Sequence, residues 1–339
     1  LSKDETIVKR VRRMGYESYL ANSLIGIFLS LRADWHIYNF GELDINSFLT
    51  KFSKNINLWH GLMFKKFKKN KSQGFFFKLS GFFFKKYLFY PNKLYANQIL
   101  NHYPKWKYEL LTSNQPRNIL LTNNNKENFN KFTTSDEKKI CIDIKKKNKK
   151  IIGYFPTWRE NGLELFPNTN SYSDMVKLNK ILKKKNTILL IKKHPNSFKK
   201  DKHQFYNKDI DFFYKKIKNL SNFYLLDYNT DLNSVMHLCD TLISDYSGAI
   251  FDYLLLNRPI IFYVPDLESY KKNPGIHFNL DTIKIGPVVE SFQDLLKTLN
   301  IHLKNPIKLN KTYCKKIKNF KNKIFIKNEC FNEIVKVLD

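Results

Sequence analysis

The chain has 339 residues, of which 42% are hydrophobic and 15% aromatic, and its formal net charge is +29. The length predicts two domains of about 150–190 residues, and the apolar content excludes a disordered chain. The charge fits an anionic partner, but it comes mostly from lysines scattered among Asn, Ile and Phe, which compositional bias explains equally well.

Several classes of protein lose support from missing patterns. The four cysteines show no CxxC spacing or paired pattern, which is typical of a reduced cytosolic protein, and Cys239 reads as a core residue. There is no zinc-type cluster, no signal-peptide layout, and no apolar run of the ~18 residues that a membrane span needs. The sequence opens on what reads as the middle of a helix, so we expect a truncated N-terminus.

Residues 1–147 are predicted to form an N-terminal domain. The segment NINLWHG, residues 55–61, reads as a short strand that ends at Trp59, His60 and Gly61. Residues 75–90 contain two Phe triplets flanked by lysines. Polar residues around 122–147 predict a linker that ends this domain.

Residues 148–339 are predicted to form a second domain, ending in C-terminal helices. Near-continuous apolar strands are expected at 151–155, 187–193, 223–227, 241–245 and 259–264, with helices at 231–240 and 248–257. This alternation predicts an α/β fold with a parallel sheet covered on both faces. Ligands bind beyond the carboxyl ends of such strands, where Trp59-His60, Pro156-Thr157, Lys192-Lys193-His194 and Ser244–Gly248 are expected.

The polar turn at Ser247-Gly248 is predicted to lie at the N-terminus of the 248–257 helix. Unpaired backbone N–H groups there attract an anion, and Asp252, one turn later, could reach a hydroxyl of the same ligand. The alternative is that Ser247 simply caps the helix. No GxGxxG or P-loop lysine motif is present, which disfavours the usual dinucleotide and NTPase folds.

Two histidines, His60 and His194, follow predicted strands. Histidine is well suited to accept a hydroxyl proton near neutral pH, and the Lys192-Lys193-His194 cluster suits a multiply charged phosphate. A single histidine is more often structural, but two at the ligand-binding edge favour a catalytic role.

Six segments together resemble the CDP-glycerol:poly(glycerophosphate) glycerophosphotransferase family of teichoic acid and capsule polymerases. They are residues 57–65, 116–118, 154–160, 189–195, 243–270 and 286–296, in that order. The resemblance implies a GT-B-like architecture, in which two Rossmann-like domains face each other across a cleft. Residues 1–147 would be the acceptor-side domain and residues 148–339 the nucleotide-donor-binding domain.

The resemblance also implies the site residues. His60 and His194 would be catalytic, with His60 as the general base. The donor would be bound by Trp59, Gly61, Leu62, Met63, Arg117, Pro156, Thr157, Lys192, Lys193, Ser247, Gly248 and Asp252. The motifs supply positive charge from the protein and require no metal, although they leave room for a supporting Mg²⁺.

The expected reaction transfers an alditol phosphate, expected to be glycerol phosphate, from CDP-glycerol or CDP-ribitol to a hydroxyl of a lipid-linked polyol-phosphate or capsule acceptor, releasing CMP. Leu62-Met63, Gly248 and residues 273–278 depart from the family pattern, which leaves the alditol and the acceptor open. The alternatives are a GT-B glycosyltransferase with a nucleotide-sugar donor, an inactive scaffold, and a basic nucleic-acid-binding protein, for which no recognisable module is visible.

The expected location is cytoplasmic and peripheral, on the inner face of the cell membrane. Consecutive Phe triplets cannot all face one core from a helix, and with Lys78, Lys85, Lys86, Tyr87 and Tyr90 they predict a surface helix at an anionic membrane. The alternative is that these phenylalanines pack inside the N-terminal domain.

Overall fold

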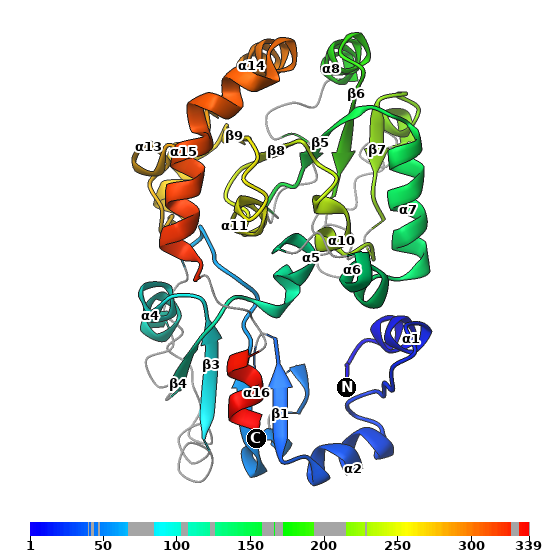
Figure 1. Ribbon diagram of the computed structural model, residues 1–339, viewed down its shortest axis with the longest axis vertical. Helices are drawn as coiled ribbons and strands as arrows, with labels where there is room; N and C mark the ends of the chain where they lie inside the picture. Colours follow the sequence, from blue (N-terminus) through cyan, green and yellow to red (C-terminus); the bar gives the residue numbers. More distant parts are fainter. Residues whose placement is uncertain are drawn as a thin grey trace. The chain divides into compact units, whose positions relative to one another are not determined.

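The computed structural model describes residues 1–39, 41, 44–46, 48–66, 85–102, 108–122, 126–157, 166, 172–192, 215–227, 229–326 and 332–338 (Figure 1). The chain divides into two compact units. Unit 1 comprises Leu1–Leu62, Phe67–Thr134 and Asn322–Asp339, and unit 2 comprises Met63–Lys66 and Ser135–Lys321. Within the described residues, no helix has both the length and the apolarity required to span a bilayer.

Unit 1 is built on a parallel sheet whose described strands follow the order β1-β2-β3-β4. These strands are β1 (Trp35–Tyr38), β2 (Lys54–Asn57), β3 (Lys86–Tyr90) and β4 (Glu109–Thr112). The helical segments are α1 (Glu5–Arg13), α2 (Leu24–Arg32), η2 (Leu49–Phe52), α4 (Lys93–His102), η3 (Pro116–Asn118), α5 (Ile119–Thr122), α6 (Lys126–Phe132) and α16 (Asn332–Leu338). Ile56, Phe89 and Ile334 form the buried centre of this unit.

The first helix begins at Glu5, because Asp4 caps it: the Asp4 carboxylate accepts a hydrogen bond from the Thr6 N–H at 2.8 Å. The expectation that Leu1 lies in the middle of a helix is therefore wrong. Helix α2 begins in the same way, with the Ser23 hydroxyl accepting from the Gly26 N–H.

Unit 2 has a parallel sheet of described strands in the order β10-β9-β8-β5-β6-β7. These are β5 (Lys150–Tyr154), β6 (Thr187–Ile191), β7 (Phe223–Leu225), β8 (Thr241–Ser244), β9 (Ile260–Tyr263) and β10 (Val288–Val289). Relative to the first strand, this is the doubly wound order of a Rossmann fold, and the order reverses between β5 and β8. The predicted α/β fold class is confirmed.

The helices of unit 2 are α7 (Ser135–Lys146), α8 (Tyr172–Lys184), α10 (Leu232–Met236), α11 (Ala249–Leu254), α12 (Leu267–Lys272), α13 (Leu280–Ile283) and α14 (Phe292–Lys304); α15 (Pro306–Ile324) leads back toward unit 1. Side chains of α8 and α14 pack with the sheet in one core, and Phe166 stacks on Tyr154 with ring centroids 4.1 Å apart. Every residue of β6, β8 and β9 is buried, because the sheet is covered on both faces.

The stretch around 122–147, predicted as a linker, is largely helical. Its second helix, α7, packs into unit 2: Cys141 and Ile144 are buried, and the Glu137 carboxylate accepts from the Asp231 N–H at 2.7 Å. The division therefore falls between Thr134 and Ser135 rather than at 147/148. The prediction missed this helix because its buried apolar residues, which lie one helical turn apart, are interspersed with lysines in the sequence.

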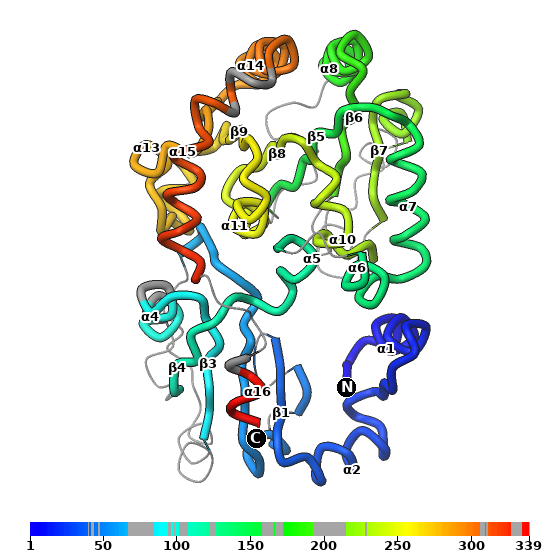
Figure 2. Tube along the Cα trace, viewed as in Figure 1, coloured from blue at the N-terminus to red at the C-terminus, as the bar shows by residue number. Residues whose placement is uncertain are grey.

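The chain also returns to unit 1 after α15, although the prediction assigned all residues from 148 onward to the second domain. The Asn114 side chain donates to the Ile326 carbonyl at 2.7 Å, and Asn92 donates to the Lys323 carbonyl at 2.8 Å. Helix α16, red in Figure 2, completes the core of unit 1 through Ile334.

The predicted membrane segment, residues 75–90, is described only in part, since the Phe triplets lie outside the described residues. Its last five residues form strand β3 between β2 and β4, where Leu88, Phe89 and Tyr90 are buried. The prediction of a surface helix is wrong for these residues, because they form a strand between two others, and consecutive side chains, which point to opposite faces of the sheet, are buried.

Candidate active site

The loop after β2 carries the first group of predicted site residues. Trp59 is fully buried, and its backbone has φ +56°, in the left-handed region that bulky residues rarely adopt. The Asn57 side chain holds this conformation by accepting the Trp59 N–H at 2.9 Å. Strain of this kind gathers at functional sites, where the surrounding structure maintains it.

Two side chains, one directly before η3 and one within it, hold the same loop. The Gln115 amide donates to the Leu58 carbonyl at 2.8 Å, and Arg117 Nη1 donates to the His60 carbonyl at 2.6 Å. Gly61 has φ +100°, and a Cβ atom there would lie 2.0 Å from Arg117 Nη2. Unit 1 therefore brings Arg117 against His60 and Gly61, and glycine is the residue that leaves room for the guanidinium.

His60 is held as a neutral imidazole. Burial and the positive charge of Arg117 lower its pKa from 6.5 to about 4, against a smaller opposing effect of Asp44. Its ring lies 4.6 Å from that of Trp59, measured between centroids. The ring is therefore unprotonated at physiological pH and can accept a proton, and the lowered pKa makes it a weaker base than an ordinary histidine.

In unit 2 the loops that follow β5 and β8 are joined by hydrogen bonds. The Thr157 N–H donates to Asp245 Oδ1 at 2.8 Å, and the Ser244 hydroxyl donates to the Phe155 carbonyl at 2.7 Å. The structure therefore brings Pro156-Thr157 beside the residues that lead to Ser247-Gly248. Both loops lie at the carboxyl ends of their strands, next to the point where the strand order reverses.

Helix α11 begins directly after Gly248 and is shorter than the predicted helix over 248–257. The Ser247 hydroxyl accepts from the Ala249 N–H at 3.3 Å, so the serine does contribute to capping. Gly248 has φ −59°, which any residue adopts, so the backbone does not require glycine there. Asp252, in the first turn, is buried.

Lys192 follows β6 and is buried, with its Nζ donating to the Asp227 carbonyl at 2.7 Å. This contact uses one of the three N–H donors of the ammonium group. Lys193 and His194 lie outside the described residues. Of the remaining predicted residues, Leu62 is buried and Met63 half-buried.

Two positioning residues received no role in the sequence analysis, although one of them, Asp245, lies within the Ser244–Gly248 stretch expected at the ligand-binding edge. Gln115 and Asp245 bind backbone groups of loops that come from elsewhere in the chain. The signal for Asp245 was its place directly after a buried strand; Gln115 had no signal beyond its nearness to Arg117. Within the described ranges, no cluster of three or more His, Cys, Asp or Glu side chains could hold a metal.

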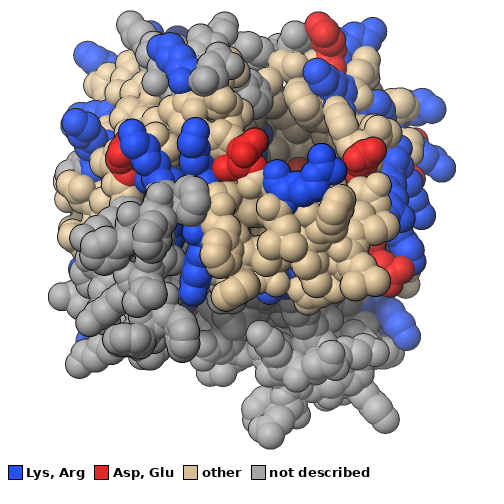
Figure 3. Space-filling model, turned by 90° about the horizontal axis from the view of Figure 1, so that it is seen from below, with Lys and Arg blue, Asp and Glu red and all other residues tan. Residues whose placement is uncertain are grey.

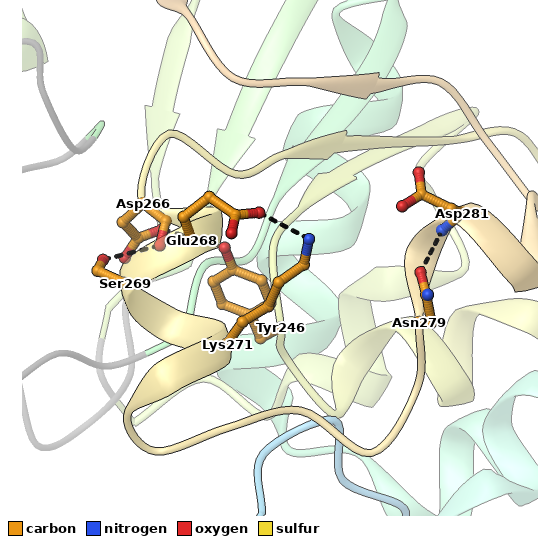
Figure 4. Close-up of polar contacts among 7 residues, drawn as sticks. All are labelled: Tyr246, Asp266, Glu268, Ser269, Lys271, Asn279 and Asp281. Atoms are coloured by element: carbon orange, nitrogen blue, oxygen red, sulfur yellow. Dashed lines mark hydrogen bonds and ion pairs between the residues drawn. The ribbon is translucent and has the colours of Figure 1, made fainter.

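The turn formed by residues 245–248, called the elbow below, is also anchored through Tyr246. Tyr246 is buried, its ring stacks on Tyr270 with centroids 3.8 Å apart, and its hydroxyl donates to Asp266 at 3.2 Å. Figure 4 shows Tyr246 lying against helix α12, whose Glu268 and Lys271 form an exposed ion pair at 2.7 Å. Helix α12 therefore supports the elbow through Tyr270 and through Asp266, the residue just before the helix.

Comparisons with known proteins identify the family of the chain. The family model for CDP-Glycerol:Poly(glycerophosphate) glycerophosphotransferase matches residues 4–329. A teichoic acid poly(glycerol phosphate) polymerase from Bacillus spizizenii is 30% identical over 219 residues, which cover 63% of this chain and 50% of that protein. The teichoic acid ribitol-phosphate polymerase TarL of Staphylococcus aureus is 30% identical over 158 residues, or 45% of this chain and 25% of that protein.

A solved structure of the wall teichoic acid polymerase TagF shares the fold. It superposes with a TM-score of 0.66 at 21% identity, covering 94% of this chain and 75% of that chain. The chain thus spans half the length of the first curated relative and a quarter of the second.

Proposed function

Because the chain belongs to the CDP-glycerol:poly(glycerophosphate) glycerophosphotransferase family, we propose that it transfers an alditol phosphate from a CDP-linked donor to a hydroxyl of a teichoic acid or capsule acceptor. CMP is the second product. The observation that carries the proposal is the Trp59-His60-Gly61 loop, which is strained, clamped by Arg117 and presents a neutral histidine.

In the proposed reaction, the acceptor oxygen forms a bond to the phosphorus that bears the alditol. The bond from this phosphorus to the bridging oxygen of the pyrophosphate breaks, and CMP leaves with that oxygen. The proton of the acceptor hydroxyl passes to the ring of His60, whose low pKa keeps it unprotonated before the reaction.

Charge on the donor phosphates is proposed to be neutralised by protein groups. Arg117 and Lys192 are the described cations of the proposed set, and Lys193 and His194 complete it from outside the described residues. Backbone N–H groups at Ser247 and Gly248 add further donors, because Gly248 has no side chain to cover them. The proposed step uses no metal; assays with EDTA and with added Mg²⁺ test this point.

The test is incubation of the chain with radiolabelled CDP-glycerol or CDP-ribitol and a lipid-linked polyol-phosphate acceptor. We expect CMP release and label in the polymer with at least one CDP donor, and no transfer from UDP-glucose or UDP-N-acetylglucosamine. Transfer from a UDP-sugar alone would instead identify a glycosyltransferase. His60→Ala should lose activity by roughly 10²–10⁴-fold, the usual contribution of a general base, and a loss below about tenfold would exclude that role.

We further propose that the reaction takes place at the cytoplasmic face of a membrane, with α1 and α2 as the attachment surface. Leu24, Phe28 and Leu31 on α2 are 87%, 55% and 61% exposed. Arg12, Arg13 and Arg32 are exposed on or beside the same helices. Figure 3, a view from below, shows an area without charged side chains that is bordered by Lys and Arg and a few Asp and Glu side chains. Exposed apolar residues with basic neighbours suit an anionic bilayer surface.

A further inference from the structure

Asp245 occupies a central position at the carboxyl edge of the unit 2 sheet. It follows β8 directly and is only 3% exposed. One of its oxygens, Oδ1, accepts two backbone hydrogen bonds, from Thr157 N–H at 2.8 Å and from Tyr246 N–H at 2.6 Å. A single carboxylate oxygen therefore fixes the loop after β5 against the loop after β8.

A second set of contacts holds the same two loops. Directly before Asp245 in the chain, the Ser244 hydroxyl donates to the Phe155 carbonyl at 2.7 Å, and the Phe155 N–H donates to the Ile243 carbonyl at 3.2 Å. Directly after Asp245, Tyr246 is fixed by its stacking on Tyr270. These contacts fix both loops, and Asp245 is the charged side chain among the residues that make them.

A buried carboxylate beside a site for a pyrophosphate is unfavourable in itself, because the two negative charges repel each other. Its presence therefore needs a compensating role. The two short bonds to N–H groups give one, since charge-assisted hydrogen bonds are stronger than neutral ones and fix geometry.

We propose that Asp245 is a positioning residue for the donor site. It sets the separation between Pro156-Thr157 and Ser247-Gly248, so that both loops contact the pyrophosphate of one CDP-linked donor. This inference rests on the proposed function, and it assigns to Asp245 no contact with the donor.

The chain offers a matched control at the other end of the same strand. Asp240 precedes β8, and its Oδ2 accepts from the Ile151 N–H at 2.8 Å. Like Asp245, it ties β8 to β5 through a carboxylate, but at the amino ends of the strands, away from the ligand-binding edge. Asp240 is exposed and its carboxylate is bonded to one N–H group, so Asp240→Ala removes a weaker tie between the same two strands without altering the site.

The conservative variant separates geometry from charge. Asp245→Asn retains an oxygen that can accept both N–H groups and lacks the negative charge, whereas Asp245→Ala retains neither. We expect the donor KM and the Kd for CDP-glycerol or CDP-ribitol to rise about 10- to 100-fold in Asp245→Ala, the usual effect of losing a charge-assisted bond. Asp245→Asn should weaken binding less than Asp245→Ala, because it keeps the accepting oxygen and loses only the charge. Asp240→Ala should bind the donor unchanged while melting at a lower temperature.

The measurement is titration calorimetry and steady-state kinetics on the full chain. Wild-type affinity in Asp245→Ala, or equal weakening in Asp245→Asn and Asp245→Ala, would overturn the inference while leaving the proposed function intact. Failure of the wild type to bind either donor would overturn the proposed function, and this inference with it.

Hydrogen exchange on the wild type gives a result that does not depend on the folding of any variant. Donor binding should slow amide exchange at Phe155 and Thr157 and in residues 246–249 together, because one carboxylate couples the two loops. Protection of only one of these segments would count against the coupling.

Discussion

Trp59 and Gly61 show how single residues define the loop after β2. A left-handed conformation at a non-glycine residue costs roughly 1–3 kcal/mol, and complete burial of the indole ring offsets a cost of that size. Gly61 has the opposite role, because its missing side chain is what admits Arg117. The two residues on either side of His60 are therefore specified by different physical needs, and both serve to fix the histidine.

The low pKa of His60 predicts an unusual pH profile. A histidine acts as a base only when unprotonated, so kcat/KM should stay level from pH 7.5 to about 5.5 and fall only as pH approaches the His60 pKa of about 4. A histidine with its ordinary pKa of 6.5 would instead cost about tenfold at pH 5.5. CMP release at saturating acceptor, with circular dichroism to confirm folding at each pH, checks this.

Arg117→Gln is the control for that profile. Removing the guanidinium charge should raise the His60 pKa, and the acidic limb should move to higher pH. The movement should be partial, because burial is the larger cause of the low pKa. If the acidic limb of the pH profile does not move in this variant, a group other than His60 causes that limb.

At the scale of elements, the short helix α11 determines how the elbow can be tested. It ends at Leu254 and is followed by Asn257 at φ +53°, before Pro259 and β9. Since Gly248 has an ordinary helical conformation, Gly248→Val should fold. We expect it to weaken CDP-glycerol binding more than Ser247→Ala does, because a branched side chain would cover the backbone N–H groups. Unchanged affinity in both variants, measured by titration calorimetry, would make the elbow a simple turn.

Helix α2 is the element on which membrane attachment is predicted to depend. Replacing Leu24, Phe28 and Leu31 with Ser should reduce co-sedimentation with anionic liposomes, and added salt should reduce binding of the wild type. These side chains are exposed, so the variant should keep the wild-type melting temperature. Ile301→Ser, at a position 64% exposed on α14 of unit 2, is the control. Equal binding by the triple variant and the wild type would place attachment elsewhere.

The elements differ in how far the sequence could predict them. The strands of unit 2 were recognisable because residues buried on both faces leave near-continuous apolar runs, as at 187–191 and 260–263. Helix α7 was missed because lysines conceal the turn-to-turn spacing of Cys141 and Ile144. Strand β3 was interpreted as part of a surface helix because that interpretation rested on the Phe triplets and lysines beside it in the sequence. Its pairing with β2 and β4 is not visible in the sequence.

The residues of the candidate site also differ in how far the sequence could predict them. His60, Arg117 and the elbow could be named because their residue types and order carry a resemblance. The contacts of Gln115 with the Leu58 carbonyl and of Asp245 with the Thr157 N–H join residues that are 57 and 88 positions apart. No local pattern encodes such pairs, since they exist only once the strands have aligned.

For the whole molecule, the discontinuous course of unit 1 leads to a prediction about stability. Ile334→Ala, which opens the core around Ile56 and Phe89, should destabilise unit 1 by about 2 kcal/mol or more. Ile317→Ala, a fully buried position of α15 in unit 2, should destabilise unit 2 instead. Hydrogen exchange followed by mass spectrometry should locate the faster amides in β1–β4 for the first variant and in the unit 2 sheet for the second. The same pattern in both would mean that the units unfold as one.

The return of the chain to unit 1 also has a consequence for biosynthesis. A ribosome makes β1–β4 first, then the whole of Ser135–Lys321, and only afterwards the helix that contributes Ile334. At synthesis rates of about 5–20 residues per second, the sheet of unit 1 therefore lacks this helix for about 10–40 s after it has been synthesised. During that interval the apolar surface around Ile56 and Phe89 is open to chaperones, and unit 2 has all of its residues only when the interval ends.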